Sequence, residues 1–148
     1  MNQEKYLLDK GMLLLQRREH SARELKYKLS RYCSDSALVE NTLLELQNRG
    51  YLSNQRFTEN YTHARASRGF GMIRIALELK EKGVSAEQID QTFRQLNYDW
   101  VGMANAVREK RFGLEIPNDQ TEKWQQIKFL QYRGFTQEQI NQVFSLFC

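Results

Sequence analysis

Apolar residues recur at steps of three and four along most of the chain, which is the spacing of one face of an amphipathic helix. β-branched residues are few and scattered rather than alternating, and a single proline, Pro117, interrupts the chain. The pattern therefore predicts an all-α fold. The helices are expected near residues 4–18, 21–32, 36–49, 54–68, 71–82, 86–97, 98–112, 122–133 and 137–147.

The hydrophobic pattern repeats along the sequence. A shift of 50 positions lays residues 25–46 over residues 75–96 without a gap, with apolar residues matched at helical spacing. A shift of 51 lays residues 83–93 over residues 134–144, and six of these eleven positions are identical. Chance periodicity would not also match Gly, Glu and two Gln, so we infer three tandem three-helix repeats in an elongated, curved arrangement. The repeats are expected at residues 1–52, 53–97 and 98–148, with an internal linker at about 113–121 in the third.

Local signals mark where several helices begin and end. A Ser or Thr is followed three residues later by Glu or Gln, the spacing of a capping box, in three places: Ser21 with Glu24, Ser85 with Gln88, and Thr136 with Gln139. Gly83 and Gly134 stand just before two of these starts. We expect both glycines to end the preceding helix in the left-handed conformation.

The charge distribution suits an anionic partner but does not require one. The 148 residues carry a formal charge of +4, and residues 17–74 hold eleven Lys and Arg against six Asp and Glu. Two clusters of basic residues are candidates for a binding face. The first contains Arg56, Arg65, Arg68 and Arg74, and the second contains Arg17, Arg18, Lys26 and Arg31. A solvated surface without a ligand is the alternative interpretation of both.

Other residues that could bind or react favour structural roles. Phe57 and Tyr61 share a helical face and are expected to pack inward, as are Trp100 and Trp124. The backbone N–H groups of Gly69-Phe70-Gly71 could receive a phosphate ahead of a helix, but a plain interhelical turn is favoured.

Nothing in the sequence supports catalysis or a cofactor. His20 and His63 have no ligand set or catalytic partners around them, and we interpret them as surface or capping residues. Cys33 and Cys148 are interpreted as free thiols, so no metal is expected. The apolar run at residues 12–15 is too short for a signal peptide or a membrane span. We expect a cytoplasmic monomer that is not an enzyme.

The order of several motifs is familiar. They are Ser21-x-x-Glu24-Leu25 with Leu29, Gly50-Tyr51-Leu52, Arg56-Phe57 with Tyr61 and Arg65, Gly69-x-Gly71, Arg74-Ile75, Leu79 with Gly83, Asp99-Trp100, Lys110-x-Phe112 and Arg133-Gly134-Phe135. In this set and spacing the whole chain resembles the RecX family, bacterial regulators of the RecA recombinase. Ser53-Asn54 and Met72 depart from the residues that are common in the family at those positions.

The resemblance implies a protein that binds RecA filaments on single-stranded DNA. Such a protein lies in the filament groove and restrains ATP hydrolysis, strand exchange and co-protease activity. Binding to free single- or double-stranded DNA is left open, and the two basic clusters become the hypothetical filament-facing residues. The alternative is a helix-turn-helix transcription regulator, since a three-helix unit can place a recognition helix in the major groove. Acidic residues on the expected helices 86–97 and 137–147 argue against that alternative.

Overall fold

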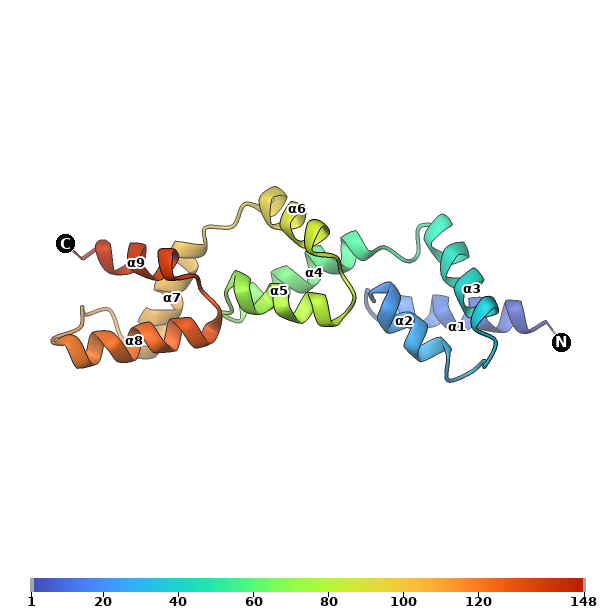
Figure 1. Cartoon of the computed structure of the whole chain (residues 1–148), viewed down its shortest axis with the longest axis horizontal. Helices are drawn as coiled ribbons and strands as arrows, with labels where there is room; N and C mark the ends of the chain where they lie inside the picture. Colours follow the sequence, from blue (N-terminus) through green and yellow to red (C-terminus); the bar gives the residue numbers. More distant parts are fainter. Residues whose placement is uncertain (1, 148) are drawn as a thin grey trace. The chain divides into compact units, whose positions relative to one another are not determined.

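The structure, a computed structural model, describes residues 2–147 and contains helices but no strand within that range. Nine helices follow one another along the described residues (Figure 1). They are α1 (Gln3–Arg17), α2 (Ala22–Leu29), α3 (Ser36–Asn48), α4 (Asn54–Ser67), α5 (Met72–Glu81), α6 (Ala86–Leu96), α7 (Trp100–Phe112), α8 (Gln120–Arg133) and α9 (Gln137–Ser145). The prediction of an all-α fold is confirmed, and each bound lies within three residues of its expected position.

The predicted caps explain why several helices begin where they do. Ser21 and Thr136 each accept a hydrogen bond from the third residue of their helix, whose side chain accepts from the cap backbone in return. The hydroxyl of Ser85 accepts from the N–H of Gln88 at 3.2 Å, but the Gln88 amide lies against Gln55 instead of closing the box. Gly83 and Gly134 have φ values of 90° and 101°, so their expected left-handed conformation is confirmed.

The linker in the third repeat is shorter than predicted. Asp119 accepts a hydrogen bond from the N–H of Glu122 at 2.8 Å and caps α8, so Gln120 and Thr121 are helical. Glu122 in turn accepts from the backbone N–H of Asn118 at 2.8 Å. Because this carboxylate pair satisfies the free donors of the first turn, α8 begins two residues earlier than expected.

The chain divides into two compact units. The first contains the residues up to Tyr61 together with Leu79–Thr92, and the second contains Thr62–Glu78 together with the residues from Phe93 onward. Helices α1–α3 therefore lie in the first unit and α7–α9 in the second, while α4, α5 and α6 contribute to both. The elongated, curved arrangement and the repeat boundaries stay predictions.

The core of the first unit comes from the apolar faces that the sequence repeat identified. α1 contacts α2 and α3, and eight buried residues form one cluster: Leu7, Leu25, Leu29, Cys33, Val39, Leu43, Leu46 and Leu52. Burying each large aliphatic side chain contributes about 1.5–3 kcal/mol. The free thiol of Cys33 lies in this core, and Cys148 lies outside the described residues.

The second unit is built in the same way at the other end of the chain. α7 contacts α8 and α9 (Figure 1). Its buried apolar residues include Ile75, Phe93, Trp100, Ala104, Leu130, Phe135, Ile140, Val143 and Phe144. Val39, Ile89 and Ile140 hold equivalent positions in the sequence repeat and are all buried, so the repeat is a repeat of core positions.

Candidate anion-binding surfaces

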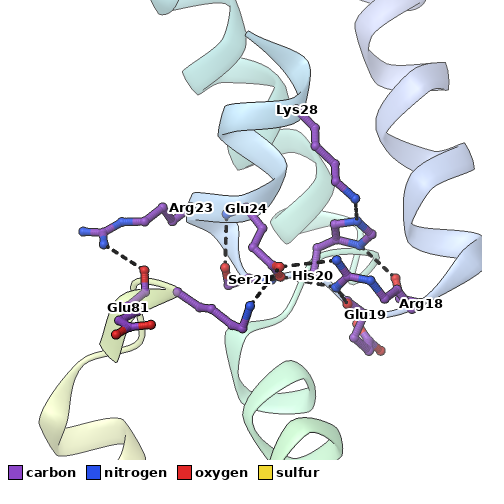
Figure 2. Close-up of polar contacts among 9 residues, drawn as sticks. Arg18, Glu19, His20, Ser21, Arg23, Glu24, Lys28 and Glu81 are labelled. Carbon is purple, nitrogen blue, oxygen red and sulfur yellow. Dashed lines mark hydrogen bonds and ion pairs between the residues drawn. The ribbon is translucent and has the colours of Figure 1, made fainter. Parts of the chain in front are cut away.

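Arg18, a member of the second basic cluster, forms an ion pair with a carboxylate in the first unit. Its two terminal nitrogens lie 3.3 Å from the two carboxylate oxygens of Glu24 (Figure 2). Glu24 also accepts from the N–H of Ser21 at 3.1 Å and lies 3.7 Å from the ammonium of Lys82. Burial opposes ionisation of Glu24, but Arg18, the Ser21 N–H and Lys82 outweigh it and lower the pKa of this carboxyl. The charge of Arg18 is therefore largely neutralised.

His20, two residues after Arg18, is buried, which corrects the expectation that it is a surface or capping residue. Its side chain is 1% exposed, with Nδ1 3.0 Å from the carbonyl oxygen of Arg18 and Nε2 2.8 Å from the ammonium of Lys28 (Figure 2). Since an ammonium can only donate, Nε2 accepts and Nδ1–H donates to the carbonyl. Burial lowers the pKa of His20, so the imidazole is neutral at pH 7.

The rest of the second cluster is mostly paired as well. Lys26 forms an ion pair with Glu40. Arg31 donates to the hydroxyl of Tyr27 at 3.2 Å and stacks over its ring. Arg17 and Arg31 are both exposed with no carboxylate within 4.0 Å among the described residues, but only Arg17 also lacks a side-chain partner there such as Tyr27.

Arg56, from the first cluster, stabilises the turn that precedes α4 through hydrogen bonds. Its Nε donates to Glu19 at 2.8 Å, and Nη2 donates to the carbonyl oxygens of Gly50 at 2.7 Å and Tyr51 at 3.2 Å. The side chain is still partly exposed, but its donors serve the fold of the first unit. Phe57 beside it is buried as predicted, and Tyr61 is half-buried.

Arg65 and Arg74 converge on one aromatic ring and one carboxylate in the second unit. Arg65 donates to both oxygens of Glu78 at 2.9 and 3.0 Å, and Arg74 reaches the same carboxylate at 3.5 Å. Both guanidinium groups stack over Phe70, with centroid distances of 4.0 and 4.4 Å. A bidentate, stacked arginine is a strongly oriented arrangement, so Arg65 joins α4 to α5 through Glu78, while Arg74 pairs with Glu78 within α5.

The Gly69-Phe70-Gly71 segment is an interhelical turn, as favoured, and its donors are occupied. The N–H of Gly71 donates to the carbonyl of Arg133 at 2.8 Å, and the N–H of Ile73 donates to that of Gly134 at 2.9 Å. The start of α5 is therefore capped by the end of α8. These N–H groups are not available to a phosphate.

Arg68 differs from the other three arginines of its cluster because it lines a pocket. The pocket has a volume of about 580 Å³ and lies between the end of α4, α7 and α8, all within the second unit. Lys110, Arg111 and Arg133 line it together with Arg68, and its lining contains no Asp or Glu. Sequence reasoning missed these three partners because it sought the binding face within residues 17–74. The adjacent Lys110-Arg111 pair was the available signal.

Two further residues depart from a simple surface or core assignment. Arg108 is fully buried and donates to Asn105 at 3.1 Å, to the carbonyl of Glu115 at 3.4 Å and to Gln126 at 3.3 Å. Trp124, expected in the core, is 54% exposed with Lys128 over its ring, whereas Trp100 is buried as expected. His63 is exposed as expected.

Two kinds of site are absent from the part of the chain that the structure describes, a metal site and a membrane-spanning helix. No group of three or more His, Cys, Asp or Glu residues there could hold a metal ion. None of the helices in residues 2–147 is both long enough and apolar enough to cross a bilayer. Stacked helical repeats are typical of proteins whose surfaces bind other macromolecules.

Comparison with known proteins identifies the family. The family model for the second three-helix domain of RecX matches residues 53–92, and that for the third matches residues 98–144. Regulatory protein RecX of Halorhodospira halophila is 43% identical over 132 residues, covering 89% of this chain and 82% of that protein. Regulatory protein RecX of Legionella pneumophila is 39% identical over 136 residues, covering 92% and 91%. The chain belongs to the RecX family of regulatory proteins, and the predicted resemblance is confirmed.

A solved structure supports the fold independently of sequence. The crystal structure of RecX from Lactobacillus salivarius superposes with a TM-score of 0.84, covering 96% of this chain and 94% of that chain at 16% identity. At this identity the likeness concerns the fold alone. Membership in this family of regulatory proteins confirms the prediction that the protein is a regulator rather than an enzyme.

Proposed function

We propose that this protein binds RecA filaments assembled on single-stranded DNA, lies in their groove and restrains their ATP hydrolysis, strand exchange and co-protease activity. The observation that carries the proposal is family membership over about nine tenths of the chain, among relatives named as regulatory proteins. Helical repeats in general stack into extended binding surfaces, which suits a long partner. The proposal includes action as a monomer in the cytoplasm.

The ion pairs of the basic residues indicate which of them are available to contact the filament. Arg65, Arg74 and Arg56 donate to groups of their own units, and Arg18 and Lys26 are paired with carboxylates. Arg17 and Arg68 are exposed, and no described carboxylate lies within 4.0 Å of either. We therefore expect Arg17 and Arg68 to contribute most to contacts with a negatively charged filament.

The alternative, a helix-turn-helix transcription regulator, gains no support from the helices that would enter the major groove. α6 exposes Glu87 and Asp90 against one basic residue, Arg94. α9 contains Glu138 and no Lys or Arg. Acidic side chains on a recognition helix would face the phosphates unfavourably.

The test measures ATP hydrolysis by RecA filaments preformed on single-stranded DNA. The protein is added at well below one molecule per RecA, and we expect the hydrolysis rate to fall. Co-sedimentation with the filaments reports binding separately. If neither the rate nor the sedimentation changes at equimolar protein, the proposal is rejected, and sequence-specific duplex binding without RecA would then favour the alternative.

A charge reversal locates the contact. Arg68→Glu should weaken filament binding about fivefold, because an attraction of about 0.5 kcal/mol at an exposed site becomes a repulsion of similar size. Lys128→Glu is the matched control, since Lys128 is also exposed in the second unit but lies outside the Arg68 pocket. Equal weakening by both variants would reject a specific contact at Arg68 and leave only general attraction.

A further inference from the structure

The pocket beside Arg68 concentrates positive charge without any compensating carboxylate. Lys110 and Arg111 come from the last turn of α7, Arg133 ends α8, and Arg68 follows α4. Within residues 2–147, no Asp or Glu oxygen lies within 4.0 Å of any of these four cations. Four like charges around one pocket repel one another, so an anion in the pocket would relieve that repulsion.

Two of the arginines are held in place before any ligand arrives. Arg111 and Arg133 stack over the ring of Phe129, with centroid distances of 5.7 and 5.2 Å, and Arg133 also stacks over Phe70 at 4.8 Å. Nη1 of Arg133 donates to the carbonyl of Arg68 at 3.1 Å, which fixes the guanidinium further. An oriented guanidinium loses less conformational entropy when it binds a phosphate.

The floor of the pocket is apolar and accessible. Met103 and Val107 are half-buried on α7, and Ala106 beside them is exposed. Gly69 packs so closely on Val107 that an added Cβ would lie 2.7 Å from it, so the backbone of the turn forms one wall. An apolar floor under a basic rim matches a ligand that combines a flat apolar group with anionic groups.

We propose that this pocket binds one nucleotide unit of single-stranded nucleic acid, with the base against Met103 and Val107 and the flanking phosphates on Arg68, Lys110, Arg111 and Arg133. A volume of about 580 Å³ accommodates a nucleotide. Guanidinium groups match phosphate oxygens in geometry, and basic grooves with an apolar or aromatic surface are typical of single-strand binding. A duplex would reach the rim but leave the floor unused, because its bases are stacked inside.

This inference deepens the proposed function, because a filament on single-stranded DNA contains such a strand. It does not depend on RecA, however, and can be tested without it. The assay is fluorescence anisotropy of a labelled oligothymidylate of about 20 nucleotides, longer than the roughly 4–16 nucleotides that a single small domain covers. Wild-type protein should bind the strand at low salt and release it as the salt concentration rises.

Three variants test the pocket itself. Lys110→Gln should weaken binding about threefold and reduce the slope of log K against log salt by about 0.7, the value for one phosphate contact on a single strand. Ala106→Glu places a carboxylate in the pocket from an exposed helical position and should abolish binding. Lys128→Gln, which removes the same charge elsewhere in the second unit, should leave binding unchanged. Far-UV circular dichroism and the melting temperature check that each variant is folded.

Competitors identify the occupant. An unlabelled single strand should displace the probe, while a duplex of equal length and polyglutamate should do so poorly. The inference is overturned if folded wild-type protein does not bind the probe, or if Lys110→Gln and Lys128→Gln weaken binding equally. Stronger displacement by polyglutamate would assign the pocket to an acidic protein segment instead, and equal displacement by duplex would reject the role of the base.

The outcomes separate the two proposals. Restraint of RecA ATP hydrolysis without any oligonucleotide binding would overturn the pocket and leave the proposed function standing. Pocket-dependent oligonucleotide binding without any effect on RecA filaments would overturn the proposed function and leave the pocket standing.

Discussion

His20 and Arg108 are buried basic side chains whose hydrogen bonds are satisfied without a carboxylate. His20 lies between a backbone carbonyl and an ammonium, and Arg108 donates to two side-chain amides and a carbonyl. Burial lowers the pKa of both groups. Arg108 stays charged because its ordinary pKa is very high, whereas His20 titrates in an accessible range. The histidine therefore couples the stability of the first unit to pH.

The sign of that coupling follows from the lowered pKa of His20. The folded protein binds the proton less readily than the unfolded chain, so its stability is complete above about pH 6.5, the ordinary histidine value, and falls below it. Protonation would place a second cation against Lys28 and beside Arg18. Glu24 does not contribute in this range, because its pKa is held below the ordinary value and it stays ionised. The free energy of unfolding should therefore decrease between pH 7 and pH 5.

His20→Gln isolates this effect. The Gln amide can still accept from Lys28 and donate to a carbonyl, and the substitution should cost about 1 kcal/mol at pH 7. Urea unfolding at pH 7, 6 and 5 should show a smaller decrease in the variant than in the wild type. Parallel pH dependences in the two proteins would mean that another group is responsible.

At the scale of elements, the sequence predicted the features that depend on residues close together in the chain. Ser21 and Thr136 begin helices because a hydroxyl and a side chain three residues later satisfy neighbouring donors, and that pattern is visible in the sequence. The docking of α5 on the end of α8 was not visible. Two of its contacts join Gly71 to Arg133 and Ile73 to Gly134 by backbone hydrogen bonds, across about sixty residues, and such bonds leave no pattern in the side chains.

Gly71 should be essential for that docking. A Cβ at this position would lie 2.5–2.6 Å from backbone atoms of Gly134 and Phe135, which cannot move aside as a flexible side chain could. Gly71→Ala should cost about 2–3 kcal/mol, as forced overpacking typically does. Denaturant unfolding followed by tryptophan fluorescence measures the cost, because Trp100 and Trp124 both lie in the second unit.

Gly113→Ala is the control for Gly71→Ala. Gly113 has a φ of 93° but open space around its Cβ position, so it tests backbone strain without a clash, and the cost should be about 1 kcal/mol. A loss below about 1 kcal/mol in Gly71→Ala would mean that the packing at Gly71 can accommodate a Cβ.

At the scale of the whole molecule, the sequence predicted the repeats but not which basic residues are available for binding. Glu78 forms ion pairs with Arg65 and Arg74, and Arg65 is distant from it in the sequence. Glu24 and Lys82 form an ion pair although 58 positions separate them. Charge counts along a sequence do not record such pairing. The pocket of Arg68, Lys110, Arg111 and Arg133 likewise combines the residue after α4 with the ends of α7 and α8, so only the adjacent Lys110-Arg111 pair is visible in the sequence.

The two compact units should unfold together. The chain passes between them at three points, after Tyr61, Glu78 and Thr92, and each point lies inside a helix rather than in a loop. Separate unfolding would break α4, α5 and α6 in the middle and leave their backbone groups without partners. Far-UV circular dichroism reports both units and tryptophan fluorescence reports the second alone, so the two transitions should coincide.

Leu7→Ala makes this expectation specific. Leu7 is fully buried in the core of the first unit, and its truncation should cost about 2–5 kcal/mol. If the helices couple the units, the fluorescence transition of the second unit should move to lower denaturant together with the circular dichroism transition. Leu13→Ala, on the same helix but 47% exposed, should move neither by much. A biphasic circular dichroism curve with an unmoved fluorescence transition would mean that α4, α5 and α6 break at the boundary, and that the units are independent in stability.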